Sequence, residues 1–324
     1  MMPVGILLVG GLGTRLAPLT SKTPKPMLPI ANLPVTEHQL LVAKAAGITK
    51  VVLATAYLAE TFTPYFGDGS KWGMELIYAL ESEPLGTGGA IRNAAELVLS
   101  EISENEPIVV FNGDVLSRHD LRSQIKLHQD TNAAATLHLV SVEDARPYGC
   151  VPFDKSGRVT DFLEKMDSPI TNTINAGCYV FNPQVIREIE LGKVVSVERE
   201  IFPQLLKAGS VVQAFVDDSY WLDMGTPRAL LKGSQDYVGD RACIVGIGSN
   251  IAKSAIISGA SAIGNDVTIG ENVEIVASII RDGAKIGAGS KLQNVFVEAN
   301  SVVAENTHAI AAYLANGELT ELKL

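Results

Sequence analysis

The sequence feature that most constrains the fold is a six-residue repeat of aliphatic residues in the last quarter of the chain. The repeated positions are Ile251, Ile257, Ile263, Ile269 and Ile275, then, after a one-residue skip, Ile280, Ile286 and Leu292, and finally Val297 and Val303. Glycine often follows the aliphatic residue directly, as at Gly264, Gly270 and Gly287. A period of six fits neither an α-helix nor a simple β-strand, but it is typical of a parallel β-helix whose aliphatic residues point inward.

We therefore expect residues 239–324 to form a short left-handed parallel β-helix of about three coils. Within this domain we expect residues 309–324 to form a short helix or a cap. A solenoid leaves open ends, which usually stack on another domain of the chain or on a partner subunit. We therefore also expect a homo-oligomer, with a dimer through the β-helix as one candidate arrangement.

A second strong feature lies at the N-terminus, where an apolar run at residues 4–9 predicts a buried strand. The glycine-rich segment that follows, residues 10–29, has the sequence GGLGTRLAPLTSKTPKPMLP. Its early glycines allow a ligand to approach the backbone closely. No acidic residue occurs before position 37, so three cations stand unneutralised at the carboxyl end of the first strand: Arg15, Lys22 and Lys25. Open α/β sheets bind ligands at this edge, and the charge favours a polyphosphate, although a surface turn with solvated lysines is the simple alternative.

Alternating strand and helix patterns over residues 1–238 predict a Rossmann-like α/β domain. The expected strands lie at residues 51–55, 75–79, 108–111 and 134–142, and the expected helices at 37–46, 59–66, 89–99 and 120–129. Parallel pairing is expected between the first strands. Alternating residues at 148–165 predict an antiparallel extension over the sheet's edge, so the sheet should be mixed.

Composition excludes several classes of partner. The net charge is −10 and the isoelectric point is about 5.1, which argues against binding to nucleic acid or to a membrane surface. The first apolar run is too short for a signal peptide or a transmembrane helix. Cys150, Cys178 and Cys243 lack metal-ligand spacing and cannot all pair, so we expect reduced thiols and a cytoplasmic protein.

Two loops after expected strands are candidates for ligand binding. In the loop ESEPLGTGG, residues 81–89, Thr87 is the expected N-cap of the next helix. Three glycines of this loop would leave room for something flat to lie there: Gly86, Gly88 and Gly89. In the string NGD that follows residues 108–111, Asp114 is well placed to bind Mg²⁺, with an Asx turn or helix cap as the alternative.

Two further features are predicted to be structural. The string SVEREIFP, residues 196–203, predicts an imperfect capping box with Ser196 as N-cap and Arg199 where an acid is usual. Three histidines lack a partner pattern and are expected to be surface or packing residues: His119, His128 and His138.

The glycine-rich segment matches neither the GxxxxGK[ST] motif nor a complete GxGxxG motif. The string GGLGTRLAPLT…PKPMLP instead resembles the signature of the nucleoside-diphosphate-sugar pyrophosphorylases, GxGTRLxPLT…PKP. Further strings resemble motifs of the same family in the expected order: EPLGTGG, FNGDVL, FLEK, NAGCY and WLDMGTP. The resemblance covers nearly the whole chain and implies a sugar-1-phosphate nucleotidyltransferase. Within the family, EPLGTGG and SVEREIFP favour the mannose-1-phosphate guanylyltransferase branch.

The resemblance also implies a role for each matching residue. The nucleotide would contact Leu8, Gly10, Gly11, Gly13, Thr14, Glu83, Gly86, Asn112 and Gly113. The sugar phosphate would contact Gly149, Glu164, Lys165 and Asn175. The metal ligands would be Asp114 and Asp223, and the catalytic cations Arg15, Lys25 and Lys165. Met166 stands where the family pattern has proline, so the turn beside Lys165 departs from that pattern.

The implied reaction joins mannose 1-phosphate and GTP, with Mg²⁺, to give GDP-mannose and pyrophosphate by in-line attack on the α-phosphate. Two anions must meet, so positioning and charge stabilisation should carry the catalysis. Arg15 and Lys25 would neutralise the triphosphate and its leaving group, while Lys165 would anchor the attacking sugar phosphate.

Three alternatives remain open. Thymidylyl or uridylyl transfer to glucose 1-phosphate is the nearest one. A non-catalytic regulatory subunit that binds nucleotide sugars is the second, and the presence of all the implied cations and aspartates disfavours it. A hexapeptide acyltransferase is the third, but such enzymes normally need a histidine on the β-helix, and only His308 lies in this region.

Overall fold

The computed structural model describes residues 3–56, 58–163 and 165–324, and this part of the chain divides into two compact units. The first unit comprises residues 3–11 and 36–221, and the second comprises residues 12–35 and 222–324. Most of the glycine-rich segment therefore belongs to the same unit as the C-terminal repeats. The domain boundary predicted after residue 238 stays a prediction.

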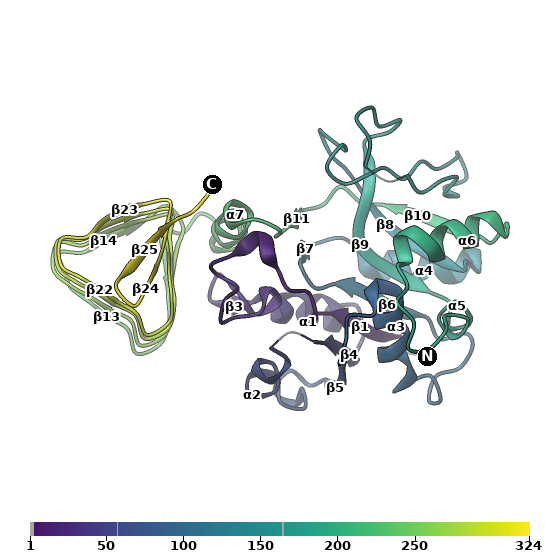
Figure 1. Ribbon diagram of the computed structural model, residues 1–324, viewed down its shortest axis with the longest axis horizontal. Helices are drawn as coiled ribbons and strands as arrows, with labels where there is room; N and C mark the ends of the chain where they lie inside the picture. The colour runs from purple at the N-terminus through teal and green to yellow at the C-terminus, as the bar shows by residue number, and fades with distance from the viewer. Residues whose placement is uncertain (1–2, 57, 164) are drawn as a thin grey trace. The chain divides into compact units, whose positions relative to one another are not determined.

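The first unit is built on a mixed sheet (Figure 1), in which the described residues form strands in the order β10-β8-β9-β6-β1-β4-β5. These strands are β1 (Val4–Leu8), β4 (Lys50–Thr55), β5 (Glu75–Leu80), β6 (Ile108–Asn112), β8 (Ala135–Ser141), β9 (Thr173–Phe181) and β10 (Val212–Val216). All neighbours pair in parallel except β9, which runs antiparallel to both β6 and β8. The predicted Rossmann-like mixed sheet is thus confirmed.

Helices and turns connect the strands of this unit. They are α1 (Val35–Ala45), α2 (Thr63–Phe66), α3 (Gly86–Glu96), α4 (Leu121–Thr131), α5 (Pro183–Arg187) and α6 (Phe202–Lys207), with 3₁₀ turns at Ala59–Thr61 and Ser70–Trp72, a π-helical turn at Val197–Ile201 and a short strand β7 (Val115–Ser117). In α3, Ile91, Ala94 and Ala95 recur at helical spacing and are buried in one core with Ile6 and Val110 of the central strands. The small side chains let α3 lie close to the sheet.

Among the described residues, the antiparallel extension predicted for residues 148–165 consists of isolated bridges rather than continuous strands. Cys150 bridges to Leu163 and Phe153 to Val159. Asp154 accepts hydrogen bonds from the backbone N–H groups two and four residues later, and this tight turn leaves little length for a strand on either side. Arg158 bridges antiparallel to Gln213 of the edge strand β10, so the segment does reach the predicted edge of the sheet, and β9 is a further antiparallel member inside the sheet.

The N-terminal part of the second unit consists of short turns. It contains 3₁₀ turns at Thr14–Leu16 and Lys25–Met27 and a hairpin of β2 (Pro29–Ile30) and β3 (Leu33–Pro34). After β11 (Trp221–Asp223) comes helix α7 (Pro227–Val238), whose N-cap residue Thr226 accepts a hydrogen bond from Ala229 N through its side chain. Helix α7 packs against β2, and Ser234 Oγ accepts from Ala31 N at 3.1 Å.

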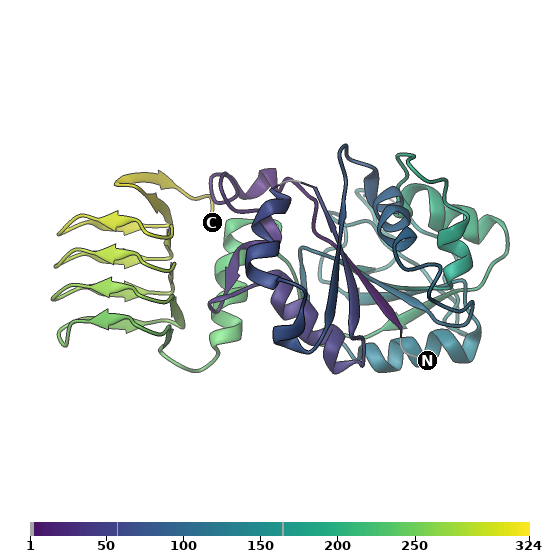
Figure 2. The same cartoon turned by 90° about the horizontal axis from the view of Figure 1, so that it is seen from below.

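The C-terminal part of the second unit is a parallel β-helix, whose stacked strands Figure 2 shows. One sheet contains β12 (Cys243–Val245), β15 (Ser261–Ile263), β18 (Ile279–Ile280), β21 (Phe296–Val297), β24 (Ala312–Ala315) and β25 (Glu318–Glu321). The second contains β13 (Asn250–Ile251), β16 (Thr268–Ile269), β19 (Lys285–Ile286) and β22 (Val302–Val303). The third contains β14 (Ile256–Ser258), β17 (Glu274–Val276), β20 (Lys291–Gln293) and β23 (His308–Ile310).

The one-residue skip in the repeat has a structural cause. Ile251 pairs with Ile269, eighteen residues later, and Ile269 pairs with Ile286, seventeen residues later. At the corner after β14 two consecutive residues have positive φ, Gly259 and Ala260, whereas the corner one coil later uses Ala277 alone. The first coil is therefore one residue longer than the next.

One sequence prediction about this domain, the number of coils, was wrong. The prediction was about three coils, but the second and third sheets each stack four strands over residues 250–310, all of which the structure describes. The last coil was hard to recognise because Ala309 takes the inward position that Ile or Leu occupies in earlier coils. Residues 309–324 form no helix. Instead, β25 folds back antiparallel on β24 and closes that sheet, which is the predicted cap.

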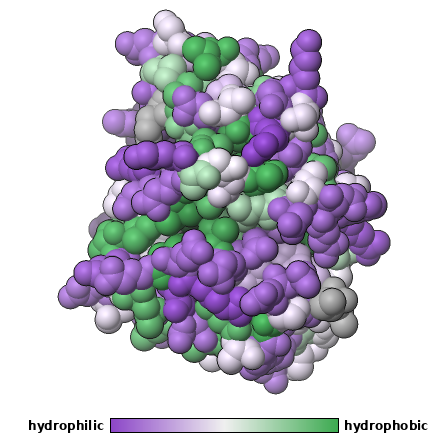
Figure 3. All heavy atoms as spheres, turned by 90° about the vertical axis from the view of Figure 1, so that its right-hand side faces the viewer, coloured by the Kyte–Doolittle hydropathy of each residue, from purple (hydrophilic) through white to green (hydrophobic). Residues whose placement is uncertain are grey.

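The face drawn in Figure 3 carries hydrophilic side chains over much of its area, with hydrophobic side chains between them. Among the described residues, no helix combines the length and the apolar character that a membrane span requires. All three cysteines are free thiols, with Cys150 and Cys178 buried, in agreement with the prediction that they do not pair.

Candidate functional site

The glycine-rich segment folds around the side chain of Lys25. Gly13 has a left-handed backbone with φ +62°, and a Cβ there would lie 2.9 Å from Lys25 Cβ and 3.1 Å from Thr20 Cγ2. Thr20 Oγ1 donates a hydrogen bond of 3.1 Å to Gly13 O and closes the turn. Lys25 is only 7% exposed, unlike Lys22, which is exposed. Gly13 is thus required by the packing that holds a buried lysine in this segment.

Arg15 and Asp223 come together at Gly225 within the second unit. A Cβ at Gly225 would lie 2.7 Å from Arg15 Nη2 and 3.1 Å from Asp223 Oδ1. The guanidinium and the carboxylate therefore both pack against the backbone of one residue, and any side chain at Gly225 would displace them. Arg15 and the neighbouring Thr14 are exposed, so this cation is also accessible to solvent.

In the first unit, the ends of β1 and β6 approach each other through Leu8 and Gly113. Gly113 N donates to Leu8 O at 3.0 Å, and a Cβ at Gly113 would lie 2.2 Å from that oxygen. A Cβ at Gly10 would lie 3.0 Å from Ala56 Cβ, so this glycine also has a packing role. Gly11 differs from both, because a Cβ there would meet no heavy atom of the described residues within 4 Å. Packing against the described residues therefore does not require glycine at position 11.

Asn112 and Asn175 converge on the hydroxyl group of Tyr179. Asn175 Nδ2 donates to Tyr179 Oη at 2.7 Å and Asn112 Nδ2 at 3.4 Å, and Tyr179 Oη donates to Glu198 Oε1 at 3.4 Å. Burial, with the nearby Glu198 carboxylate, raises the pKa of Tyr179 well above its usual value, so the phenol stays protonated. Asn175 Oδ1 accepts from Gly177 N at 3.0 Å.

Asn112 retains one unused acceptor in this network. Its Oδ1 atom is buried and has no hydrogen-bond partner among the described residues. A buried acceptor without a partner costs free energy, about 1–3 kcal/mol, so a donor supplied by a ligand would be favoured there. This arrangement agrees with the placement of Asn112 at a candidate ligand-binding edge.

The glycines of residues 81–89 have a packing role that the sequence interpretation missed. A Cβ at Gly86 would lie 2.6 Å from Val195 O, and one at Gly89 would lie 2.3 Å from Lys193 O. Both values are too short for a real contact, so the loop needs glycine in order to lie against the backbone of residues 193–195. Glu83 is exposed in this loop.

The prediction that Thr87 is an N-cap was wrong. Helix α3 begins at Gly86, its N-cap position is Leu85, and no side chain caps it. Thr87 Oγ1 instead donates to Glu198 Oε2 at 2.7 Å and accepts from Val197 N at 2.9 Å. The threonine therefore joins two loops that are more than a hundred residues apart in the chain.

The capping box predicted at Ser196 is present in a shifted form. Ser196 Oγ accepts from Arg199 N at 3.2 Å, as an N-cap should. The reciprocal bond, from Ser196 N at 2.8 Å, goes to Glu200 Oε1, one residue later than in the usual box. The first turn is π-helical, which moves the acid by one position and leaves Glu198 pointing toward Thr87.

The remaining sugar-phosphate candidates lie on loops of the first unit. Gly149 is buried with φ +82°, and its N–H donates to Ala145 O at 3.1 Å. Lys165 is exposed, and Glu164 lies outside the described residues. Among the described residues that were predicted to bind the sugar phosphate, the hydrogen bonds link only Asn175 to the network around Tyr179.

The metal-ligand candidates are held at different points of the fold. Asp114 is half-buried in the turn between β6 and β7, in the first unit, and Asp223 ends β11, in the second. Within the described ranges, no group of three or more His, Cys, Asp or Glu side chains has the arrangement of a metal site.

The three histidines predicted to be surface or packing residues are all packing residues. His119 and His138 stack with ring centroids 3.9 Å apart, and His138 Nε2 donates to Asp217 O at 3.2 Å. Burial lowers the pKa of His119, lowers that of His128 to about 4 and, together with His119, lowers that of His138 to about 3. His308 on β23 is exposed.

Two residues of the polar network received no role from the sequence. Tyr179 and Glu198 both lie within strings that the sequence analysis singled out, NAGCY and SVERE. Tyr179 is a polar residue in a largely apolar run, but Glu198 stands among other charged residues, and only the fold reveals that the two side chains meet.

Comparison with known proteins extends these observations. Residues 4–239 match the family model described as nucleotidyl transferase. The chain is 44% identical over 300 residues to the mannose-1-phosphate guanylyltransferase of Mycobacterium tuberculosis, covering 89% of this chain and 82% of that protein. It is 32% identical over 308 residues to a probable mannose-1-phosphate guanylyltransferase 3 of Oryza sativa, covering 93% and 84%. Among solved structures, HddC from Yersinia pseudotuberculosis complexed with GMP-PN is similar, with a TM-score of 0.62 and 29% identity over 73% of this chain and 100% of that one.

Proposed function

Because the chain belongs to the nucleotidyl transferase family, we propose that it is a mannose-1-phosphate guanylyltransferase, which makes GDP-mannose and pyrophosphate from mannose 1-phosphate and GTP. The relatives from M. tuberculosis and O. sativa carry this name, and the similar HddC structure was solved with a guanine nucleotide analogue. Such a reaction needs a concentrated positive charge and a hard metal ion to bring two phosphorylated reactants together.

One observation carries the proposal furthest, namely that Arg15 and Asp223 pack against the same backbone at Gly225. A cation that neutralises a triphosphate and a carboxylate that binds its metal ion are thereby held together. Lys25, buried in the same segment, supplies a second cation whose position is fixed by its contacts with Gly13. Charge stabilisation by fixed groups of this kind is commonly the largest contribution to catalysis.

The other candidate residues would bind the reactants. The backbone at Gly11, Gly13 and Thr14 would bind phosphate oxygens. Other contacts with the nucleotide would be made by Leu8, Gly10, Glu83, Gly86, Asn112 and Gly113. Asn175 and Gly149, with Glu164, would hold the hydroxyl groups of the sugar. Lys165 would anchor the sugar phosphate, whose oxygen attacks the α-phosphorus as pyrophosphate leaves.

We further propose that Asp114 and Asp223 bind Mg²⁺. Their carboxylate oxygens are the donors that this hard cation prefers, and Oδ1 of Asp223 is buried. When bound, the ion would neutralise the phosphate oxygens during transfer. This assignment predicts that Mn²⁺ binding, followed by electron paramagnetic resonance with GTP present, weakens in both Asp114→Asn and Asp223→Asn. Unchanged Mn²⁺ affinity in both variants would contradict it.

Substrate choice is tested directly by pyrophosphate release. The protein is incubated with Mg²⁺ and each pairing of GTP, dTTP, UTP or ATP with mannose 1-phosphate or glucose 1-phosphate. We expect the highest kcat/KM for GTP with mannose 1-phosphate. A preference for dTTP or UTP with glucose 1-phosphate would replace the proposal with the alternative transferase, and binding of GDP-mannose without any turnover would favour the regulatory subunit.

The same proposal includes the assembly and its location. The open ends of the β-helix, and the exposed strand β25, favour a homo-oligomer, with a dimer through the β-helix as the first candidate. Light scattering of the full chain and of a variant changed at β25 would test that interface. Free thiols and the absence of any role for nucleic acid or membrane in this reaction agree with a cytoplasmic enzyme.

A further inference from the structure

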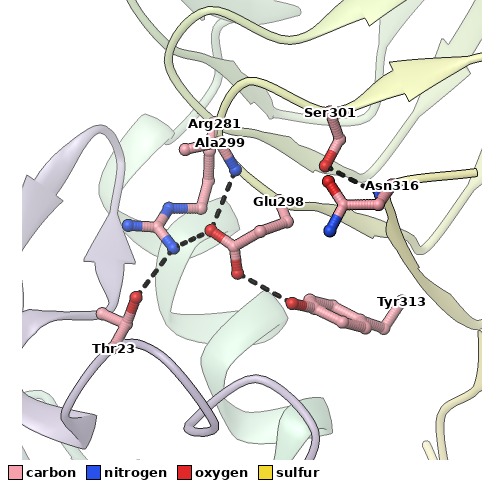
Figure 4. A network of polar contacts seen from close by, with 7 residues as sticks. All are labelled: Thr23, Arg281, Glu298, Ala299, Ser301, Tyr313 and Asn316. Carbon is pink, nitrogen blue, oxygen red and sulfur yellow. Dashed lines mark hydrogen bonds and ion pairs between the residues drawn. The ribbon is translucent and has the colours of Figure 1, made fainter.

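The 12–35 segment is attached to the β-helix at two points within the second unit. Arg281 Nη1 donates a hydrogen bond of 3.0 Å to Thr23 Oγ1, and Asn32 Nδ2 donates one of 2.6 Å to Ile263 O. Figure 4 shows Arg281 reaching from the β-helix toward Thr23. The contact at Thr23 is therefore the attachment nearer to Lys25 in the chain.

Arg281 is itself held firmly by its neighbours. It forms an ion pair with Glu298 Oε1, and the side chains of the two residues are only 19% and 12% exposed. Glu298 also accepts from Ala299 N at 2.9 Å and from Tyr313 Oη at 2.8 Å. The guanidinium carbon of Arg281 lies 6.0 Å from the ring centre of Phe296. The donor presented to Thr23 is thus fixed on several sides (Figure 4).

The repeat does not require these charged residues. Val245, Ile263, Ile280 and Val297 occupy equivalent positions in successive coils. The first two are followed by Gly246 and Gly264, whereas the next two are followed by Arg281 and Glu298. The β-helix therefore departs from its own pattern at the corner that contacts the 12–35 segment.

The backbone between Thr23 and Lys25 has little rotational freedom. Only Pro24 separates them, with φ −61° and ψ 146°, and Pro26 follows Lys25 directly. Proline fixes its own φ and restricts the residue before it, so few backbone rotations remain between the attached threonine and the lysine. Movement of Thr23 should therefore become movement of Lys25.

We propose that Arg281 is a positioning residue for the nucleotidyl transfer. By holding Thr23 it sets the place of Lys25, so the β-helix forms part of the support of the triphosphate site. This inference rests on the proposed function of Lys25, but the attachment itself can be measured without any turnover.

The experiment compares four single variants and one double variant of the full chain. Thr23→Val removes the acceptor with little change of shape, and Thr23→Ser restores it. Arg281→Met removes the donor and the charge. The control is Lys291→Met, which breaks the ion pair of Lys291 with Glu274, formed at 2.8 Å across the same seventeen-residue interval but by exposed side chains. Melting temperature is recorded for each variant to identify any that fails to fold.

Hydrogen exchange of residues 20–28 reports the attachment, and steady-state kinetics reports its consequence. We expect faster exchange in Thr23→Val and Arg281→Met, and a rise of about tenfold in the KM for GTP, since a hydrogen bond to a charged group is lost. Thr23→Ser and Lys291→Met should behave like the wild type. The double variant Thr23→Val/Arg281→Met should be no worse than the poorer single variant, because both remove one interaction.

The possible results separate this inference from the proposed function. Exchange in Thr23→Val no faster than in the control overturns the attachment, and faster exchange with unchanged kinetics overturns its role in positioning Lys25. If the wild type transfers no nucleotide, the proposed function fails, and the positioning role fails with it. Hydrogen exchange would in that case still show whether Arg281 holds the segment.

Discussion

Replacement of Gly11 by alanine should separate folding from ligand binding at the glycine-rich segment. A methyl group at Gly11 would meet no heavy atom within 4 Å among the described residues, and the backbone there is not left-handed. Where the native backbone already suits alanine, the substitution stabilises a protein by about 0.4–1 kcal/mol, because the unfolded chain loses freedom. Gly11→Ala should therefore melt at the same temperature as the wild type or slightly above it.

The affinity of Gly11→Ala for GTP should fall, although its thermal stability does not. If phosphate oxygens approach the backbone at Gly11, a methyl group there hinders a charge-assisted hydrogen bond worth about 1.5–3 kcal/mol. That energy corresponds to a rise in the KM for GTP of between about tenfold and a hundredfold. The KM for mannose 1-phosphate should change much less, because its proposed contacts are made by other residues.

Gly13→Ala is the matched comparison. Its Cβ would lie 2.9 Å from Lys25 Cβ at φ +62°, so alanine there should cost at least about 1–2 kcal/mol of folding stability as well as activity. The assays are differential scanning fluorimetry without ligand and initial rates of pyrophosphate release over a range of GTP concentrations. A Gly11→Ala enzyme with unchanged KM for GTP would refute the proposed phosphate contact, and one that melts several degrees lower would refute the interpretation of free space at this residue.

Three further outcomes are expected. Lys25→Ala and Arg15→Ala should each lower kcat/KM by about 10²–10³. Replacement of the exposed Lys22 by alanine should leave kcat/KM within about twofold of the wild-type value. Near-normal turnover of Lys25→Ala in the pyrophosphate assay would contradict a catalytic role for Lys25. Tyr179→Phe removes the oxygen to which Asn112 and Asn175 donate, so it should raise the KM for mannose 1-phosphate about tenfold. It should also lower the free energy of unfolding, measured with urea, by about 1–2 kcal/mol. An unchanged KM would mean that the network has a structural role only. The buried histidines His128 and His138 have folded pKa values of about 4 and about 3, below the unfolded value of about 6.5, so the unfolded chain binds more protons. The free energy of unfolding should therefore fall as the pH drops from about 6.5 toward 4, by up to about 1.4 kcal/mol per pH unit for each histidine. A urea midpoint that stays constant from pH 7 to pH 5 would contradict these lowered pKa values.

The periodic parts of the fold could be predicted from the sequence because their signals are local. The buried strands at residues 4–8 and 108–112 appear as apolar runs, and the repeat fixes the β-helix down to the shortened coil near Ile280. The number of coils was underestimated because the final coil uses Ala309 inside, which carries no strong signal.

The parts that could not be predicted depend on residues far apart in the chain. Thr87 looks like a helix cap when only its neighbours are considered, yet its partner is Glu198. Gly86 and Gly89 look like ligand-binding glycines until residues 193–195 are seen to lie against them. A glycine in a loop is compatible with a close ligand or a close backbone, and the sequence alone does not distinguish these two causes.

The candidate site shows the same division. The motifs identified Arg15, Lys25 and Asp223 as residues of interest, and the fold adds that Arg15 and Asp223 share a contact at Gly225. Tyr179 stood inside a recognised string, but its role as the common acceptor for Asn112 and Asn175 depends on the antiparallel insertion of β9 beside β6.

Because residues 12–35 belong to the same unit as the C-terminal repeats, the point at which two related chains are joined in a chimera matters. A chimera joined anywhere between residues 36 and 221 would combine the early segment of one parent with the solenoid of another, so Thr23 and Asn32 would face a foreign surface. Exchanges that ignore this partnership should yield chains whose halves fold but whose turnover is poor. Functional chimeras should therefore take residues 12–35 and residues 222–324 from the same parent protein.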